Sequence, residues 1–156
     1  MKRYIRSDEQ DNAADLFSAD VKTRQIQAKL TNDPDLLEIY AYDPESNVRQ
    51  YAAGNPHTPQ SALLHLAEDT NPQVIFHLCT NAKVPGEVLA RLYREFPIAV
   101  SAVAFNPNTP MDILEEIIQG GDPNTVSLIL SVWGDRLPEY LQDMITEQLD
   151  SEGTSE

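Results

Sequence analysis

The sequence has little cysteine and little positive charge, and each shortage excludes a class of protein. Cys79 is the one cysteine among 156 residues, so the chain can form no internal disulfide, no four-cysteine zinc site and no iron–sulfur cluster. Lysine and arginine number 11 against 25 aspartate and glutamate residues, which gives a net charge of −14. Phosphate affinity comes from Lys and Arg, so this balance disfavours direct binding of nucleic acid and docking on anionic membranes.

Long apolar runs and catalytic motifs are missing as well. No stretch approaches the roughly 20 apolar residues of a membrane span, and no apolar run of signal-peptide length follows the basic start MKRYIRSD. We therefore expect a soluble, cytoplasmic protein. The GxSxG, GxxxxGK[ST], GxGxxG, HExxH and CxxC patterns are absent, so the sequence predicts no catalytic residue, no metal site and no cofactor.

Proline is plentiful and regularly placed. Of the 11 prolines, most open a run of helix-forming residues, and successive openings lie 10 to 15 residues apart. Proline suits the first position of a helix because its missing N–H is not needed there. The spacing therefore predicts helices of about ten residues, each roughly 15 Å long. They open at Pro34, Pro44, Pro59, Pro72, Pro85, Pro97, Pro110, Pro123 and Pro138.

The chain also aligns on itself with a period of about 26 residues. Segments 48–69, 74–95 and 99–120 match in register, and weaker copies lie at 25–43 and 126–145. The matching positions are Asn55, Asn81 and Asn106, and Pro59, Pro85 and Pro110. Self-similarity at a fixed period is typical of a solenoid. We predict an all-α fold, a short right-handed α-solenoid of about five two-helix repeats.

The recurring asparagine is expected to end the first helix of each repeat. Asparagine tolerates the left-handed backbone conformation common at that position, and its amide can bond nearby backbone. In the last repeat Trp133 takes this place, where we expect it to close the core.

Three segments are expected along the chain. Residues 1–22 form an N-terminal cap or arm, 23–148 the solenoid and 149–156 a disordered acidic tail. The basic residues of MKRYIRSD could alternatively bind the acidic end of another copy, and the oligomeric state stays open.

The pattern VxxxAAxNPxTPxxxLxxLAxD at residues 48–69 resembles the variant leucine-rich repeat. The resemblance covers roughly residues 25–145 and implies a short all-helical solenoid. It implies no activity, since such repeats are framework. Some members of that family carry an iron–sulfur module on clustered cysteines, a role that does not carry over to a chain with Cys79 alone.

Acidic residues gather toward the C-terminal end. Residues 101–156 contain eleven acidic side chains and a single basic one, Arg136. Like charges at helical spacing repel, and nothing else in this part of the sequence offsets that cost. The surface is either a solvated end cap or a binding surface for a partner with a basic surface. Its candidate contacts are Asp112, Glu115, Glu116, Glu139, Asp143 and Glu147.

A second candidate surface follows the first helices of the repeats. Ile75, Phe76, Val100 and Leu128 occupy aligned positions there. These side chains are either buried in helices that are covered all round, or they form an apolar strip that binds a partner. In the second case Phe76 would be a contact residue.

The sequence therefore favours a non-enzymatic, acidic helical-repeat module that mediates protein–protein interaction. The alternative is an inhibitor that imitates nucleic acid and blocks a DNA-binding protein or nuclease, because rows of carboxylates can stand in for phosphates. An enzyme built on helical repeats, such as some DNA glycosylases, would need a basic concave face, and too few basic residues are present.

Overall fold

The computed structural model describes the backbone of residues 18–153 and the side chains of residues 18–150. Within this range the chain is all-helical and has no strand. The prediction of an all-α fold is confirmed for the described part. No helix in that range is long and apolar enough to cross a membrane.

The helices alternate between two sets, here called first helices and second helices. The first helices are α2 (Val21–Leu30), α4 (Ser46–Gly54), α6 (Pro72–Cys79), α8 (Val100–Phe105) and α10 (Pro123–Trp133). The second helices are α3 (Pro34–Tyr40), α5 (Gln60–Leu66), α7 (Gly86–Glu95), α9 (Met111–Gly120) and α11 (Glu139–Gly153). Two short 3₁₀ helices, η1 (Pro97–Ala99) and η2 (Gly134–Arg136), precede α8 and follow α10.

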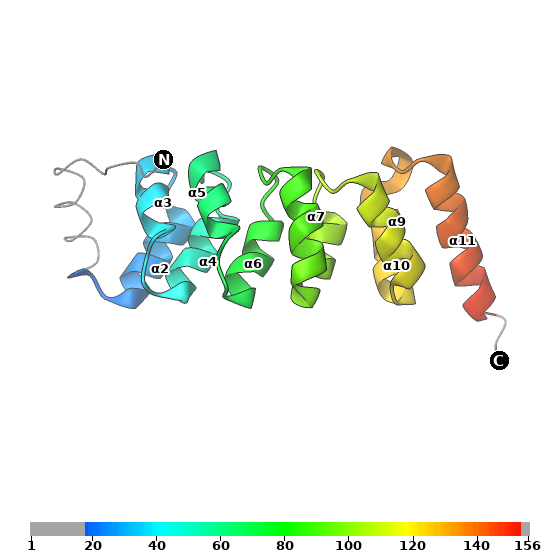
Figure 1. Cartoon of the computed structure of the whole chain (residues 1–156), viewed down its shortest axis with the longest axis horizontal. Helices are drawn as coiled ribbons and strands as arrows, with labels where there is room; N and C mark the ends of the chain where they lie inside the picture. Colours follow the sequence, from blue (N-terminus) through cyan, green and yellow to red (C-terminus); the bar gives the residue numbers. More distant parts are fainter. Residues whose placement is uncertain (1–17, 154–156) are drawn as a thin grey trace.

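The helices stand side by side in a row that follows the chain from α2 to α11 (Figure 1). First helices pack on first helices, so that α4 contacts α2 and α6, and α8 contacts α6 and α10. Among the second helices, α3 contacts α5 and α9 contacts α11. Helices this short are marginal alone, and packing in a row buries their apolar sides.

Proline marks the helix starts in two ways. Pro34, Pro72 and Pro123 are the first residues of their helices, and the preceding Asp or Asn caps the helix by accepting backbone N–H bonds. Four second helices begin one residue after the predicted proline, and at three of them the proline is the N-cap residue in extended conformation and no side chain caps the helix. These prolines are Pro59, Pro85 and Pro110.

One core runs along most of the row. It extends from Ala41 to Ile145 and contains the buried leucines and isoleucines of the middle helices. A smaller cluster around Leu37 and Tyr40 fills the space among α2, α3 and α4. The main core ties the helix pairs from α4 onward to their neighbours, and the smaller cluster joins the first pair to α4.

The expected tail boundary at residue 148 differs from the structure. Helix α11 continues to Gly153, because Leu149 is half-buried and packs against the main core. At the other end, α2 begins at Val21 with Asp20 as its N-cap. Residues 1–17 and 154–156, which include most of the expected cap and the end of the expected tail, lie outside the described residues.

Candidate interaction surfaces

Three buried asparagines join consecutive helix pairs through backbone hydrogen bonds, an arrangement we call the asparagine ladder. The side-chain amide of Asn81 donates to the carbonyl oxygens of Ala53 and Asn55, both at 2.9 Å. Asn106 makes the same contacts one pair later, with Cys79 at 2.7 Å and Asn81 at 3.0 Å. Asn55 donates to the carbonyl oxygens of Ala28, Lys29 and Thr31. Each asparagine thus bonds to carbonyls at the C-terminal end of the preceding first helix, where no further helical turn supplies N–H donors.

The ladder corrects one expectation about these residues. Asn55 and Asn106 do follow the ends of α4 and α8 directly, but their backbone is extended, and in the described range no residue other than glycine has a positive φ. The expectation that the recurring asparagine adopts a left-handed conformation is therefore wrong. The oxygen of each amide instead accepts the N–H two residues later, which fixes the turn.

Trp133 continues the ladder with a different side chain. Its indole N–H donates to the carbonyl of Ala104 at 2.8 Å, and the residue is 4% exposed. Its large ring also enters the core.

Two arginine–aspartate pairs, here called clasps, each join a first helix to the turn that follows its second helix. Arg24 donates to buried Asp43 at 2.8 Å, and Arg49 donates to Asp69 at 2.6 Å. Burial by itself raises the pKa of Asp69, but hydrogen bonds from Arg49 and from the N–H of Asn71 outweigh it and lower the pKa. Sequence reasoning missed these clasps, although Arg and Asp recur there at nearly the same separation, 19 and 20 residues.

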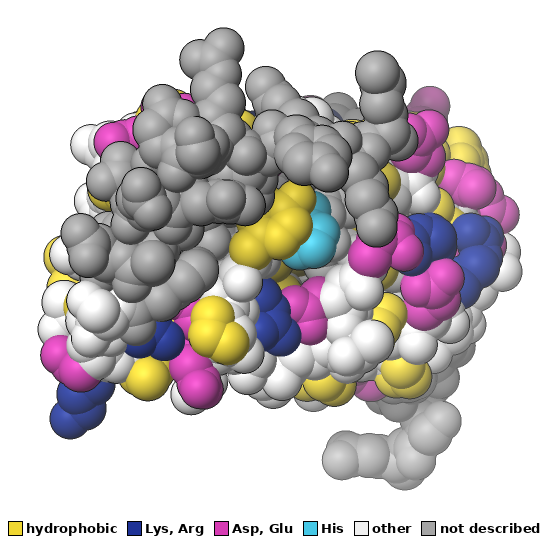
Figure 2. Space-filling view, turned by 60° about the vertical axis from the view of Figure 1, so that its left-hand side comes forward, with side chains coloured by type: hydrophobic (Ala, Val, Ile, Leu, Met, Phe, Trp, Pro, Cys, Tyr) yellow, Lys and Arg dark blue, Asp and Glu magenta, His cyan; other side chains and the backbone are white. Residues whose placement is uncertain are grey.

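Three acidic side chains in the middle of the row are paired with arginines of α7. Arg91 on α7 lies 2.7 Å from Glu68 and 3.2 Å from Glu95, and Arg94 lies 2.8 Å from Glu116 on α9. Figure 2 shows basic and acidic side chains next to one another on this side of the molecule. The expectation that Arg136 is the only base available to the acidic candidates is therefore wrong for Glu116, because Arg94 of the neighbouring helix α7 pairs with it.

Three acidic residues of α11 have no such partners. Glu139, Asp143 and Glu147 are exposed, lie at helical spacing along α11, and make no side-chain hydrogen bond or ion pair with the described residues; the same holds for Asp112 on α9. Arg136 is held elsewhere, with its guanidinium 5.0 Å from the ring of Trp133 and bonded to backbone carbonyls.

Glu115 is the remaining acidic candidate. It is half-buried and accepts a hydrogen bond of 3.2 Å from Gln119. Of the acidic candidates, four thus keep a free carboxylate within the described structure, and they lie on the contacting helices α9 and α11.

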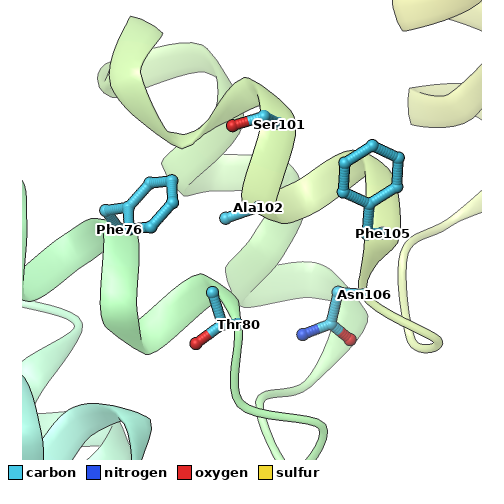
Figure 3. Close-up of a pocket in the computed structure, with 6 residues that line it drawn as sticks. All are labelled: Phe76, Thr80, Ser101, Ala102, Phe105 and Asn106. Atoms are coloured by element: carbon cyan, nitrogen blue, oxygen red, sulfur yellow. The ribbon is translucent and has the colours of Figure 1, made fainter. Parts of the chain in front are cut away.

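The expected apolar strip divides into three environments. Ile75 is fully buried, Val100 is half-buried and Leu128 is 50% exposed. Phe76 is half-buried and lines an open pocket of about 250 Å³ between α6 and α8. In Figure 3, Phe76 and Thr80 of the α6 side face the residues that belong to α8 or follow it directly, which are Ser101, Ala102, Phe105 and Asn106.

Negative charge is absent from the first helices. Helices α2, α4, α6, α8 and α10 contain no aspartate or glutamate, whereas α3, α7, α9 and α11 all do. The sequence contains this separation of acidic residues, but it can be recognised only after each helix has been assigned to one of the two sets. It gives the protein one set of helices without carboxylates and another that carries many.

The buried titratable groups are poorly suited to chemistry. Burial raises the pKa of Cys79 to about 12 and lowers the pKa of His77. A thiol with so high a pKa is a weak nucleophile at neutral pH. Among the described residues no three His, Cys, Asp or Glu side chains are grouped so that they could hold a metal ion.

Comparisons with protein-family models, with curated proteins and with solved structures found no match to this chain.

Proposed function

We propose that this chain is a non-enzymatic interaction module of the cytoplasm that binds a protein partner with a basic surface. The observation that carries the proposal is the contrast between the acidic residues that pair with arginines of α7 and the unpaired acidic residues of α11. Arg91 and Arg94 neutralise acidic residues in the middle of the row, whereas Glu139, Asp143 and Glu147 stay unpaired. Unpaired like charges on one helix face destabilise it, and a basic partner removes that cost.

The underlying architecture we propose is a right-handed α-solenoid of about five two-helix repeats with a period of about 26 residues, resembling the variant leucine-rich repeat. The asparagine ladder supports it, because successive rungs are 26 and 25 residues apart. In a solenoid each repeat contacts only its neighbours. Deleting residues 56–81 should therefore leave a shorter chain that unfolds cooperatively with a high helix content, and loss of the cooperative transition would contradict the repeat.

The binding test compares two neutralised variants of the full chain. One carries Glu139→Gln, Asp143→Asn and Glu147→Gln. The matched control carries Asp35→Asn, Glu45→Gln and Glu87→Gln, which removes the same charge from acidic residues outside α9 and α11 that also form no side-chain hydrogen bond or ion pair within the described structure. Proteins captured from an extract of the source cell are identified, and each is purified and titrated against both variants at increasing salt.

We expect a basic protein whose affinity falls at least about tenfold for the α11 variant, is unchanged for the control and weakens as salt rises. Equal binding to both variants would identify the α11 face as a solvated end cap. Displacement of the partner by duplex DNA would favour the nucleic-acid-mimicking inhibitor instead.

A further inference from the structure

A continuous row of side chains crosses the first helices from α2 to the pocket between α6 and α8. The ammonium of Lys29 lies 5.9 Å from the ring centre of Tyr51 on α4. The Tyr51 ring lies 6.2 Å from that of His77 on α6, and His77 lies 5.8 Å from Phe76, which lines the pocket. We call this row, together with Phe105 on the far wall of the pocket, the first-helix face.

The charge of this face is opposite to that of the molecule as a whole. The five first helices carry no carboxylate, although the protein has a net charge of −14. On α2, Lys22 and Lys29 are exposed and form no ion pair with the described residues. An acidic segment approaching this protein is therefore repelled by the second-helix side and attracted to the α2 end of the first-helix face.

The pocket at the other end of the row accepts apolar groups. Its amide residue, Asn106, is 2% exposed and already uses both its nitrogen and its oxygen in the ladder. The hydroxyl of Thr80 donates to the carbonyl of His77. The remaining lining is two phenylalanines, Ala102 and the single hydroxyl of Ser101, so a charged side chain would lose most of its hydration there in exchange for at most one hydrogen bond.

Size decides what kind of molecule fits. The pocket volume of about 250 Å³ is below the range of roughly 300–1,000 Å³ that holds a drug-sized ligand. It is large enough for one bulky side chain, and its open mouth leads onto the aromatic row. An occupant that fills the pocket and also reaches Lys29 must span α2 to α8, which requires a chain rather than a small molecule.

We propose that the first-helix face binds a polypeptide segment with two features: an aromatic or large aliphatic side chain that enters the pocket between Phe76 and Phe105, and a carboxylate that lies over Lys29. This site is separate from the acidic face of α11, so a partner of opposite charge can bind each.

The test selects short peptides from a random displayed library on the full-length protein, and titrates the enriched peptides in solution. Ser101→Trp places a ring at the mouth of the pocket from an exposed position, and Ser127→Trp makes the same change at an exposed position of α10, away from the pocket. Lys29→Glu reverses the charge on the face, and Lys83→Glu is its control in the turn after α6. Chemical shifts of the wild-type Phe76 and Phe105 rings give a readout that needs no variant.

We expect enriched peptides to share one bulky apolar and one acidic residue. Affinity should fall about tenfold or more with Ser101→Trp and with Lys29→Glu, and change less than about twofold in the two controls. Both phenylalanine rings should shift on binding. The proposal is overturned if no peptide is enriched, if bound peptides leave both rings unshifted, or if the α11 variant abolishes peptide binding while Ser101→Trp does not.

Discussion

The indole N–H of Trp133 donates to the carbonyl oxygen of Ala104, at the end of α8, over 2.8 Å. This bond does for the last helix pair what an asparagine amide does for the three preceding junctions. The indole has a single donor and serves one carbonyl, whereas each asparagine amide serves at least two.

Replacing Trp133 by phenylalanine tests that bond. The ring remains but the donor is lost, which leaves the buried carbonyl of Ala104 without its partner. We expect the free energy of unfolding to fall by about 1–3 kcal/mol in urea titrations. Tyr140→Phe removes a polar group from an exposed ring on α11 and should change stability by less than about 0.5 kcal/mol. An equal change in the free energy of unfolding for the two variants would show that the hydrogen bond of the indole contributes nothing to stability.

Asn81→Ala should be among the most damaging polar substitutions in the chain. It leaves the buried carbonyl of Ala53 unpaired and removes one of the two donors to the carbonyl of Asn55, and we expect a loss of about 2–4 kcal/mol by urea unfolding. Asn108 also donates to two carbonyls, but from an exposed position. Asn108→Ala should therefore cost about 1 kcal/mol or less, and a comparable loss in both variants would contradict the importance of burial.

The Arg49–Asp69 clasp predicts a specific sensitivity to acid. The pKa of Asp69 is lower in the folded chain than in the unfolded chain, so its contribution is complete above the unfolded pKa of about 3.9. That contribution is lost as pH falls through the lower, folded pKa. In urea titrations from about pH 5 to about pH 2.5, wild type should lose more stability than Asp69→Asn. Parallel pH profiles would count against the clasp.

Cys79 should be inert while the protein is folded. Its side chain is fully buried and its pKa is raised to about 12. A thiol reagent can therefore react only when the packing around Cys79 opens locally. Labelling should accelerate when denaturant is added. It should also accelerate in Asn106→Ala, which removes the bond to the carbonyl of Cys79. Rapid labelling of the native chain would contradict this burial.

The two adjacent glycines after α9 should respond in opposite ways to alanine. A Cβ on Gly120 meets nothing within 4 Å, and Gly120→Ala should add about 0.5–1 kcal/mol because alanine favours the helix. A Cβ on Gly121 would lie 2.4 Å from the carbonyl oxygen of Ile117, so Gly121→Ala should destabilise. The measurement is the unfolding temperature of each variant. Equal shifts in the two variants would refute the predicted difference between Gly120 and Gly121.

Much of the fold was predictable because its determinants are local. Proline and the preceding Asp or Asn fix a helix start within two residues, as at Pro72 after Asn71. The recurrence of Asn55, Asn81 and Asn106 identified the junctions without reference to any partner. Their backbone conformation was not predictable, because the amide bonds carbonyls about 26 residues away and so does not need a left-handed turn.

The surfaces were harder to predict, since they depend on which helices become neighbours. The pairing of Arg94 with Glu116 joins residues 22 apart, and only the packed row shows that Glu116 is neutralised while Glu139 is not. The same dependence applies to Phe76, whose environment is set by α8 and not by its own helix.

Every rung of the asparagine ladder has its donor on the later helix pair and its acceptors on the earlier one. A ribosome delivers the earlier pair first. The carbonyl groups of each newly made pair therefore stay solvated until the next asparagine leaves the ribosome. This polarity suits a chain that folds during its synthesis from the amino end, one helix pair after another.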